Sequence, residues 1–463
     1  MSDFTNTGDT LTEFLIAACV SRSRDHSSGT IDGAKAILAA HPEVGRASIY
    51  AAAVLGDDVA VRQFIASDPA GATAKGGPHG WDVLTYLCFS NYLKRDRART
   101  DGFVRAATAL LEAGASPNTG WMEQNHRPES EWEPVLYGAC GVAHHPELTR
   151  LLLEHGANPN DGEVVYHAPE TYDNDAMKLL VETGKLTAEN LSLMLIRKHD
   201  WHDYEGAKYL LEHGADPKGP RERGWLAIHH ALARDNNLNM FVLLLDHGAD
   251  PTARNVHRVG GDVSDDLRTA VELAARRGRG DVLALFKRRG IPITLHGLDE
   301  LIGACAMNDG ATVQRIAASE PQLVRALLSE GAGLLAAFTG TGNVDGVRQL
   351  LDLGVPVAEL NEGDSYFGTP KNSTPLHVAA WRAHPAIVKL LLERGAPPDG
   401  RDGRGDTPLA LAVRACVNSY WTRRRSPDSV ETLLRAGASV RGISFPCGYA
   451  EVDDLLRQHG AGA

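Results

Sequence analysis

The sequence lacks any long uninterrupted apolar stretch: nowhere do 18 uncharged apolar residues follow one another. Its N-terminus, MSDFTNTGDTLTEF, is polar and acidic, and it has no basic region followed by an apolar segment, as a secretory signal would have. These two absences predict a cytoplasmic protein that does not enter a membrane.

Positive charge is also scarce. The chain has 47 lysines and arginines against 59 aspartates and glutamates, which gives a formal net charge of −12. Proteins that bind nucleic acid or an anionic membrane surface normally carry a net positive charge or, for single strands, regularly placed stacking aromatics. We therefore expect neither nucleic acid nor membrane among the partners.

Motifs for metal and cofactor chemistry are missing as well. The six cysteines form no CxxC pair and have no zinc-ligand spacing, so neither a disulfide framework nor a structural zinc site is indicated. There is no HExxH metal signature, no GxSxG nucleophile elbow and no glycine-rich phosphate loop after a strand. The sequence thus predicts no cofactor and no metal.

What the sequence does have is a recurring segment ending. It reads LLEAGASPN (110–118), LLLEHGANPN (151–160), YLLEHGADP (209–217), LLLDHGADP (243–251) and LLRAGAS (433–439). In each copy, apolar residues at helical spacing precede a glycine, and in the first four copies proline follows. This order is typical of a helix that stops at a left-handed glycine and cannot continue. The chain is therefore built of repeats.

One copy is complete, TPLHVAAWRAHPAIVKLLLERGA at 374–396, and it closely resembles the ankyrin repeat. The resemblance implies a pair of helices followed by an extended, hairpin-like finger, stacked into an all-α solenoid with a concave groove. We expect one such domain over residues 1–463, closed by a cap at 443–463. The expected repeats start near residues 13, 47, 82, 134, 163, 189, 224, 269, 299, 333, 374 and 407.

Several connections are longer than a regular repeat needs. The link between the two helices is enlarged at 21–32, 89–102, 199–205 and 415–429, and the fingers are enlarged at 119–133, 253–267 and 361–373. Such insertions cost little stability because loop-closure entropy grows slowly with length. Their aromatic and basic residues make them candidate walls of a binding site or a self-association contact.

In ankyrin-like repeats, the side of the first helix that faces the groove meets the partner. The residues we expect there, or beside it, are Tyr86, Phe89, His167, Glu170, Tyr172, Asp173, Arg197, His199, His202, His230, Arg234, Arg276, Arg277, Trp381, Arg382 and Arg414. The early positions are mostly apolar and the later ones are rich in arginine. Arginine suits carboxylates, phosphates and acidic peptides, although solvated helix residues would look the same.

The repeat at 163–184 departs most from the family. In VVYHAPETYDNDAMKLLVETG (164–184), Pro169 stands where the second small residue of the first helix belongs. Proline disfavours a helix interior, so the first helix is either shortened or begins at Pro169, and Glu170 would then lie in a first turn. The next repeats carry the polar segment KHDWHDYE (198–205), then His230 and Arg234.

These features leave three functional hypotheses. The first is a recognition or scaffold module that binds a protein, a peptide or a small anionic ligand. The second is an enzyme or small-molecule receptor in repeats 4–7, with His167 or His230 as acid or base, Glu170 or Asp173 as orienting carboxylate and Arg234 as anion stabiliser. The third is a self-assembling structural repeat. The sequence favours the first and leaves the oligomeric state open.

Overall fold

The structure is a computed structural model, and it describes residues 6–22, 26, 28–124, 130–219, 226–254, 258–259, 262–263, 267–417 and 424–462. The chain divides into two compact units, residues 1–249 and 250–463. Each unit is described by itself below. The single solenoid over residues 1–463 therefore stays a prediction.

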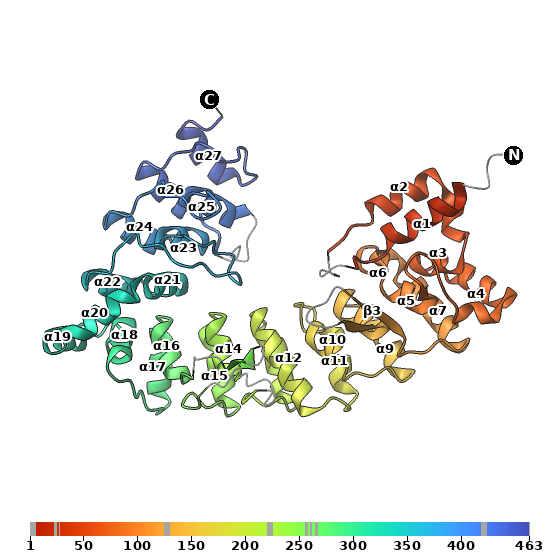
Figure 1. Cartoon of the computed structure of the whole chain (residues 1–463), viewed down its shortest axis with the longest axis horizontal. Helices are drawn as coiled ribbons and strands as arrows, with labels where there is room; N and C mark the ends of the chain where they lie inside the picture. The colour runs from red at the N-terminus through yellow and green to blue at the C-terminus, as the bar shows by residue number, and fades with distance from the viewer. Residues whose placement is uncertain are drawn as a thin grey trace. The chain divides into compact units, whose positions relative to one another are not determined.

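Seven helix pairs, called repeats 1 to 7, make up the described part of the first unit (Figure 1). They are α1 (Asn6–Ala18) with α2 (Asp32–Ala40), α3 (Ile49–Val54) with α4 (Asp58–Ser67), α5 (Val83–Cys88) with α7 (Thr100–Glu112), α8 (Val135–Tyr137) and the π-turn η4 (Gly138–Val142) with α9 (Pro146–Glu154), α10 (Gly162–His167) with α11 (Asp175–Glu182), α12 (Ala188–Asp200) with α13 (Tyr204–Glu212), and α14 (Ala227–Ala233) with α15 (Leu238–Asp246). Short extra helices fill connections: η1 (Pro42–Arg46), η2 (Pro69–Ala72), α6 (Asn91–Arg95) and η3 (Arg97–Arg99).

The described part of the second unit contains five pairs, repeats 8 to 12, and a cap. They are α16 (Ala270–Arg276) with α17 (Gly280–Arg288), α18 (Leu298–Ala306) with α19 (Gly310–Ser319), α21 (Gly331–Thr341) with α22 (Val344–Asp352), α23 (Pro375–Trp381) with α24 (Pro385–Glu393), α25 (Pro408–Val417) with α26 (Asp428–Arg435), and the cap helix α27 (Ala450–Gln458). One further helix, α20 (Pro321–Ser329), lies between repeats 9 and 10 and was not expected.

The prediction of an all-α fold is confirmed. The strands in the described residues form three two-stranded antiparallel hairpins in the fingers: β1 (Lys75–Gly76) with β2 (Trp81–Asp82), β3 (Gly120–Glu123) with β4 (Glu131–Pro134), and β5 (Arg258–Val259) with β6 (Asp262–Val263). The predicted glycine stops are present, since Gly156 and Gly395 have φ angles of 93° and 86°.

Apolar residues of each pair face the neighbouring pairs, so each unit is held together by contacts between successive repeats. Cys19, Cys88, Cys140 and Cys305 are free and buried there, as small core residues. Among the described residues no single helix is long and apolar enough to cross a membrane. One pair, α20 and α21, is bent by 76° and reaches that length and composition only when both helices are taken together.

Candidate functional site

The irregular repeat 5 begins with the short helix α10. Asp161 caps it by accepting a hydrogen bond from the backbone N–H of Glu163, and the helix ends at His167, before the buried Pro169. Of the two predicted outcomes, the first helix ends before Pro169 and does not begin there; its six residues are as many as in α3 and α5 and one fewer than in α23. Glu170 then follows the end of a helix in a turn, where its N–H donates to the carbonyl of His167 at 2.9 Å. The expectation that Glu170 lies in a first helical turn is wrong, because α11 starts only at Asp175.

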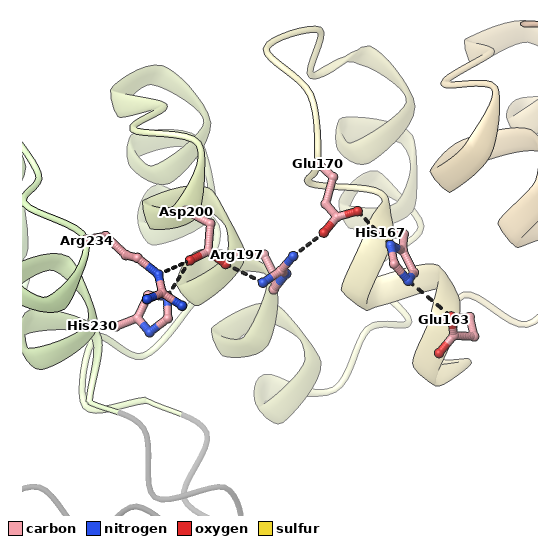
Figure 2. A network of polar contacts seen from close by, with 7 residues as sticks. All are labelled: Glu163, His167, Glu170, Arg197, Asp200, His230 and Arg234. Carbon is pink, nitrogen blue, oxygen red and sulfur yellow. Dashed lines mark hydrogen bonds and ion pairs between the residues drawn. The ribbon is translucent and has the colours of Figure 1, made fainter. Parts of the chain in front are cut away.

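His167 lies between two carboxylates (Figure 2). Its Nε2 is 3.2 Å from a carboxylate oxygen of Glu163, one helical turn back, and its Nδ1 is 2.6 Å from Glu170. Burial alone would lower the pKa of His167, but the hydrogen bonds to Glu163 and Glu170 outweigh it and raise the pKa to about 9. His167 is therefore protonated at neutral pH.

Arg197, on α12 of repeat 6, connects this group to the next repeat. Its guanidinium donates from Nη2 to Glu170 and from Nη1 to Asp200, and its Cζ lies 4.0 Å from the centre of the Tyr166 ring. The Arg197 side chain is only 12% exposed. A partly buried guanidinium with two carboxylates and an aromatic face is held in one orientation.

Asp200 extends the chain of contacts to repeat 7. One of its oxygens is 2.9 Å from Nε2 of His230, on α14, and accepts a hydrogen bond from Arg234 Nε at 2.5 Å. Burial would raise the pKa of Asp200, but His230 and the two arginines hold it well below its usual range. Burial lowers the pKa of His230 despite the carboxylate.

The seven side chains therefore form one continuous network across three repeats, as Figure 2 shows. They are Glu163, His167, Glu170, Arg197, Asp200, His230 and Arg234. With His167 charged and His230 neutral, three negative and three positive charges balance. We call this set the cross-repeat network. Its most accessible side chains are those of His167 and Arg234, each 27% exposed, and Glu170, which is 25% exposed.

Comparisons with known proteins match two parts of the chain. Family models of ankyrin repeats match residues 165–255, as three copies, and residues 367–412. The chain is an ankyrin-repeat protein.

Among its relatives, NF-kappa-B inhibitor alpha of Sus scrofa is 34% identical over 119 residues, which is 24% of this chain and 38% of the relative. A putative ankyrin repeat protein of Rickettsia bellii is 32% identical over 114 residues, 21% of this chain and 44% of the relative. The human ankyrin repeat and SOCS box protein 18 is 39% identical over 90 residues, 19% of this chain and 18% of the relative. The match spans less than half the length of each relative.

In this ankyrin-repeat protein, the other predicted residues of repeats 5 and 6 lie beside the network. Tyr172 is 56% exposed and packs edge-on against Trp201, with ring centres 5.5 Å apart. Asp173 is exposed and accepts a hydrogen bond from the N–H of Asp175 at 3.1 Å, so it orients neither histidine. His202 lies in the turn after α12, whereas His199 is fully buried, and burial lowers its pKa to about 3.

The two aromatic residues expected on an open apolar face are in fact buried. Tyr86 and Phe89 are both 0% exposed. The Tyr86 ring packs against Trp81 of β2, and the Phe89 ring packs against Trp121 of β3, at 5.3 and 5.9 Å between centres. The fingers that carry Trp81 and Trp121 cover these positions, so the expectation of an exposed surface at Tyr86 and Phe89 is wrong.

The predicted arginines of the second unit have partners within the chain. Arg276 binds Asp299 and Glu330, with contacts of 2.6 and 2.5 Å. The Arg277 and Arg382 guanidiniums lie 5.9 and 3.8 Å from the Phe367 ring centre, and Trp381 Nε1 donates to the Phe367 carbonyl at 2.6 Å. Arg414 is exposed, and its Nη2 lies 3.1 Å from a carboxylate oxygen of Asp406. Arg382 and Trp381 are buried, so they do not present the open cationic face that the sequence suggested.

The sequence indicated the segments of the network but not all of its members. Glu163 was not among the predicted site residues, although its spacing of four from His167 on one helix was a usable signal. Asp200 lies in the predicted polar segment 198–205. Its contacts with His230 and Arg234 of repeat 7 join residues 30 and 34 positions apart, and no sequence pattern near Asp200 indicates them. In the part of the chain that the structure describes, no group of three or more His, Cys, Asp or Glu is placed to hold a metal ion.

Proposed function

We propose that this ankyrin-repeat protein is a scaffold that binds another protein, and that the partner contacts the turns beside the cross-repeat network in repeats 5–7. The observation that carries this proposal is the pairing of an exposed aromatic side chain with a fixed array of charges. Similarity to a relative named as an inhibitor of NF-kappa-B supports a role in binding a protein.

Tyr172 supplies the aromatic part of this surface. It is 56% exposed, and the half-buried Trp201 of the next repeat supports one edge of its ring. Tyrosine and tryptophan are enriched among the residues that contribute most binding energy at protein interfaces. A large aromatic pair that spans two repeats therefore fits a polypeptide partner.

The network supplies specificity. Its groups are held by one another across repeats, so they do not have to be ordered when a partner binds. Both signs of charge are partly exposed: Glu170 at 25% near Tyr172, and Arg234 at 27% on repeat 7. A partner with complementary charges would be attracted, and one with like charges would be rejected.

The geometry supports the enzyme or small-molecule receptor less well. His167 is protonated at neutral pH, so it is not a ready base, and the Nε2 of His230 is occupied by Asp200. Asp173, one of the two carboxylates considered for orienting a histidine, lies outside the network. A small anionic ligand would have to compete with Glu170 and Asp200 for the arginines.

A photo-crosslinking amino acid at position 172 tests the proposal, with position 212 as a matched control. Glu212 is on the second helix of repeat 6, and its side chain is 51% exposed, close to the value for Tyr172. In cells of the native host we expect a discrete crosslinked protein from position 172 and not from position 212. Equal crosslinking at both positions, or none at 172, would refute the proposed surface.

The concave groove and the cytoplasmic location stay predictions. So does the self-assembling alternative, because residues 418–423, within the insertion at 415–429 on which it relies, lie outside the described residues. The fingers at 119–133 and 253–267 are likewise described only in part.

A further inference from the structure

A buried lysine lies near the end of α12, in repeat 6. The side chain of Lys198 is 0% exposed. Its Nζ donates a hydrogen bond to the carbonyl oxygen of Thr171, in repeat 5, at 2.6 Å, and lies 2.9 Å from Oδ2 of Asp203. Burial lowers the pKa of Lys198 despite this carboxylate, so the charge is held here at a cost in desolvation. An apolar side chain would avoid this cost, and stability alone therefore does not explain the lysine.

Asp203, the residue directly before α13, accepts two further hydrogen bonds. Its Oδ1 accepts one from the backbone N–H of Gly206 at 3.0 Å and so caps the helix. Its Oδ2 accepts one from Nδ2 of Asn174, in repeat 5, at 2.9 Å. Burial would raise the pKa of Asp203, but the charge of Lys198 and these hydrogen bonds hold it below its usual range. We call Lys198 and Asp203 the turn clamp.

The turn clamp holds repeat 5 on both sides of Tyr172. One contact is with the carbonyl of Thr171, and the other is with the side chain of Asn174. The two clamp residues also flank Trp201 in the chain, and the ring of Tyr172 packs against the ring of Trp201. The clamp therefore connects the two segments that carry this aromatic pair.

Three other repeats of this chain have a different pair of residues at the same places. His202, with a φ angle of 52°, marks the register in repeat 6, since Lys198 lies four residues before it and Gly206 four residues after it. Counted in the same way from their own positive-φ residues, repeats 4, 8 and 11 have a small residue first and a branched aliphatic residue second. The marker residues and pairs are His144 with Cys140 and Leu148, Gly278 with Ala274 and Val282, and Ala383 with Ala379 and Ile387. All six paired residues are buried, and repeat 6 exchanges the two sizes.

Gly206 leaves the space that the lysine fills. A Cβ atom on Gly206 would lie 2.7 Å from Cε of Lys198 and 2.5 Å from Oδ2 of Asp203, too close for a side chain to fit without a shift. Repeat 10 has the same exchange of sizes, because a Cβ on Gly346 would lie 2.7 Å from the ring of Phe338. An apolar side chain thus fills the corresponding space in repeat 10, and packing does not require a charge there.

We propose that Lys198 and Asp203 are positioning residues for the protein partner, and that the turn clamp sets Tyr172 and Trp201 in place before the partner binds. This inference rests on the proposed function, since it concerns the same surface. A buried charged pair seldom stabilises a fold more than apolar residues of similar size, but it can fix one geometry. A turn that is already ordered costs the complex less conformational entropy. Both clamp residues are buried, so they act through the turn.

The first test removes the clamp without leaving an unpaired charge. In Lys198→Met, Asp203→Ser, methionine keeps the length of the side chain and serine can still cap α13. Hydrogen exchange in the free protein should become at least about tenfold faster at residues 171–174, while the midpoint of thermal unfolding stays close to that of the wild type. Lys208→Met is the matched control, because Lys208 lies in the same repeat, is 45% exposed and is 3.8 Å from Glu212.

The amides of the turn report on its order. The N–H of Thr171 donates to the carbonyl of Pro169 at 2.8 Å, and the N–H of Asp173 donates to the Thr171 hydroxyl at 3.1 Å. These bonds open when the turn loses its anchors, so both amides should exchange faster in the clamp variant and at the wild-type rate in Lys208→Met. Unchanged exchange at residues 171–174 in the clamp variant would overturn the proposal.

The second measurement concerns the partner. With the photo-crosslinking amino acid at position 172, the clamp variant should give at least about fivefold less crosslinked protein than the wild type, and Lys208→Met the same amount as the wild type. Faster exchange with undiminished crosslinking would also overturn the proposal, because the contact at position 172 would then not depend on the clamp. Absence of a crosslink in the wild type would refute the proposed surface itself, whereas exchange in the free protein still decides whether the clamp orders the turn.

A further variant covers the case in which the clamp variant folds poorly. Asn174→Ala removes one anchor and leaves Lys198 paired with Asp203, and the Asn174 side chain makes no cap bond to α11. Exchange at residues 171–173 should be about threefold faster than in the wild type, and crosslinking at position 172 should fall. A turn that exchanges at the wild-type rate in Asn174→Ala would contradict the assignment.

Discussion

Replacing Glu170 by glutamine tests the electrostatics of the cross-repeat network. The side chain keeps its size and can still hydrogen-bond, but it no longer carries the charge that faces His167 at 2.6 Å and Arg197 beyond it. A rise of the His167 pKa from 6.5 to about 9 corresponds to about 3 kcal/mol of preference for the charged ring. Since Glu163 remains, we expect about half of that rise to be lost, which lowers the pKa of His167 to about 8.

The assay is an NMR titration of the histidine ring protons, with the His167 signal assigned by its absence in His167→Asn. In the wild type the signal should titrate near pH 9, and in Glu170→Gln close to one pH unit lower. His41, exposed and near Glu43 only, should be unaffected and serves as the internal control. A wild-type midpoint below pH 7, or no change in Glu170→Gln, would refute the reasoning.

The same change alters how stability depends on pH. The folded-state pKa of His167 is raised, so its contribution is fully present below pH 6.5 and is lost as the pH rises through about 9. The free energy of unfolding of the wild type, from urea denaturation, should therefore fall over this range by at most about 3 kcal/mol from this group. The raised pKa of Glu133 also makes the free energy of unfolding fall as the pH rises, and this fall begins at lower pH. Glu133 itself is not changed in Glu170→Gln. The wild type should therefore show the steeper fall, and identical slopes for the two proteins would contradict the account.

Three further predictions follow from other contacts. Asp200→Asn leaves two partly buried arginines without their shared carboxylate, so the free energy of unfolding in urea should fall by about 3 kcal/mol; a loss below about 0.5 kcal/mol would show that Asp200 is not the junction. Gly138→Ala would place a Cβ 2.7 Å from the carbonyl oxygen of Cys88, whereas Gly333→Ala meets nothing within 4 Å. Only the first should lower the unfolding temperature by several degrees, and equal effects would contradict this packing. Cys447 should react first with a thiol reagent in the folded protein, because the other five cysteines are buried whereas Cys447 is half-buried; simultaneous labelling of all cysteines would be contrary to the structure.

The fold could be predicted because its signals are local. Most repeats end in a glycine such as Gly156, which follows closely the helix that it terminates, and Pro169 restricts the helix directly before it. The extra helix α20 was missed because its nine residues, Pro321–Ser329, follow no repeat ending. Proline at its first position was the available signal.

The site was predicted less well because its contacts are not local. The family pattern placed Tyr86 and Phe89 on a surface, but whether they are exposed depends on the fingers that contain Trp81 and Trp121. His26 and Tyr137 are 111 positions apart in the chain, and no periodicity joins them. A single sequence shows which residues are unusual for the repeat, but the pairing between repeats follows only from the folded backbone.

A polypeptide that binds over the turns of repeats 5–7 should slow the exchange of their backbone amides. Hydrogen–deuterium exchange measures this once a partner has been recovered by crosslinking at position 172. We expect residues 168–174, 201–203 and 234–236 to exchange more slowly in the complex, while α11 and α13 are unchanged. Protection confined to α11 and α13, or to residues 250–463, would contradict it.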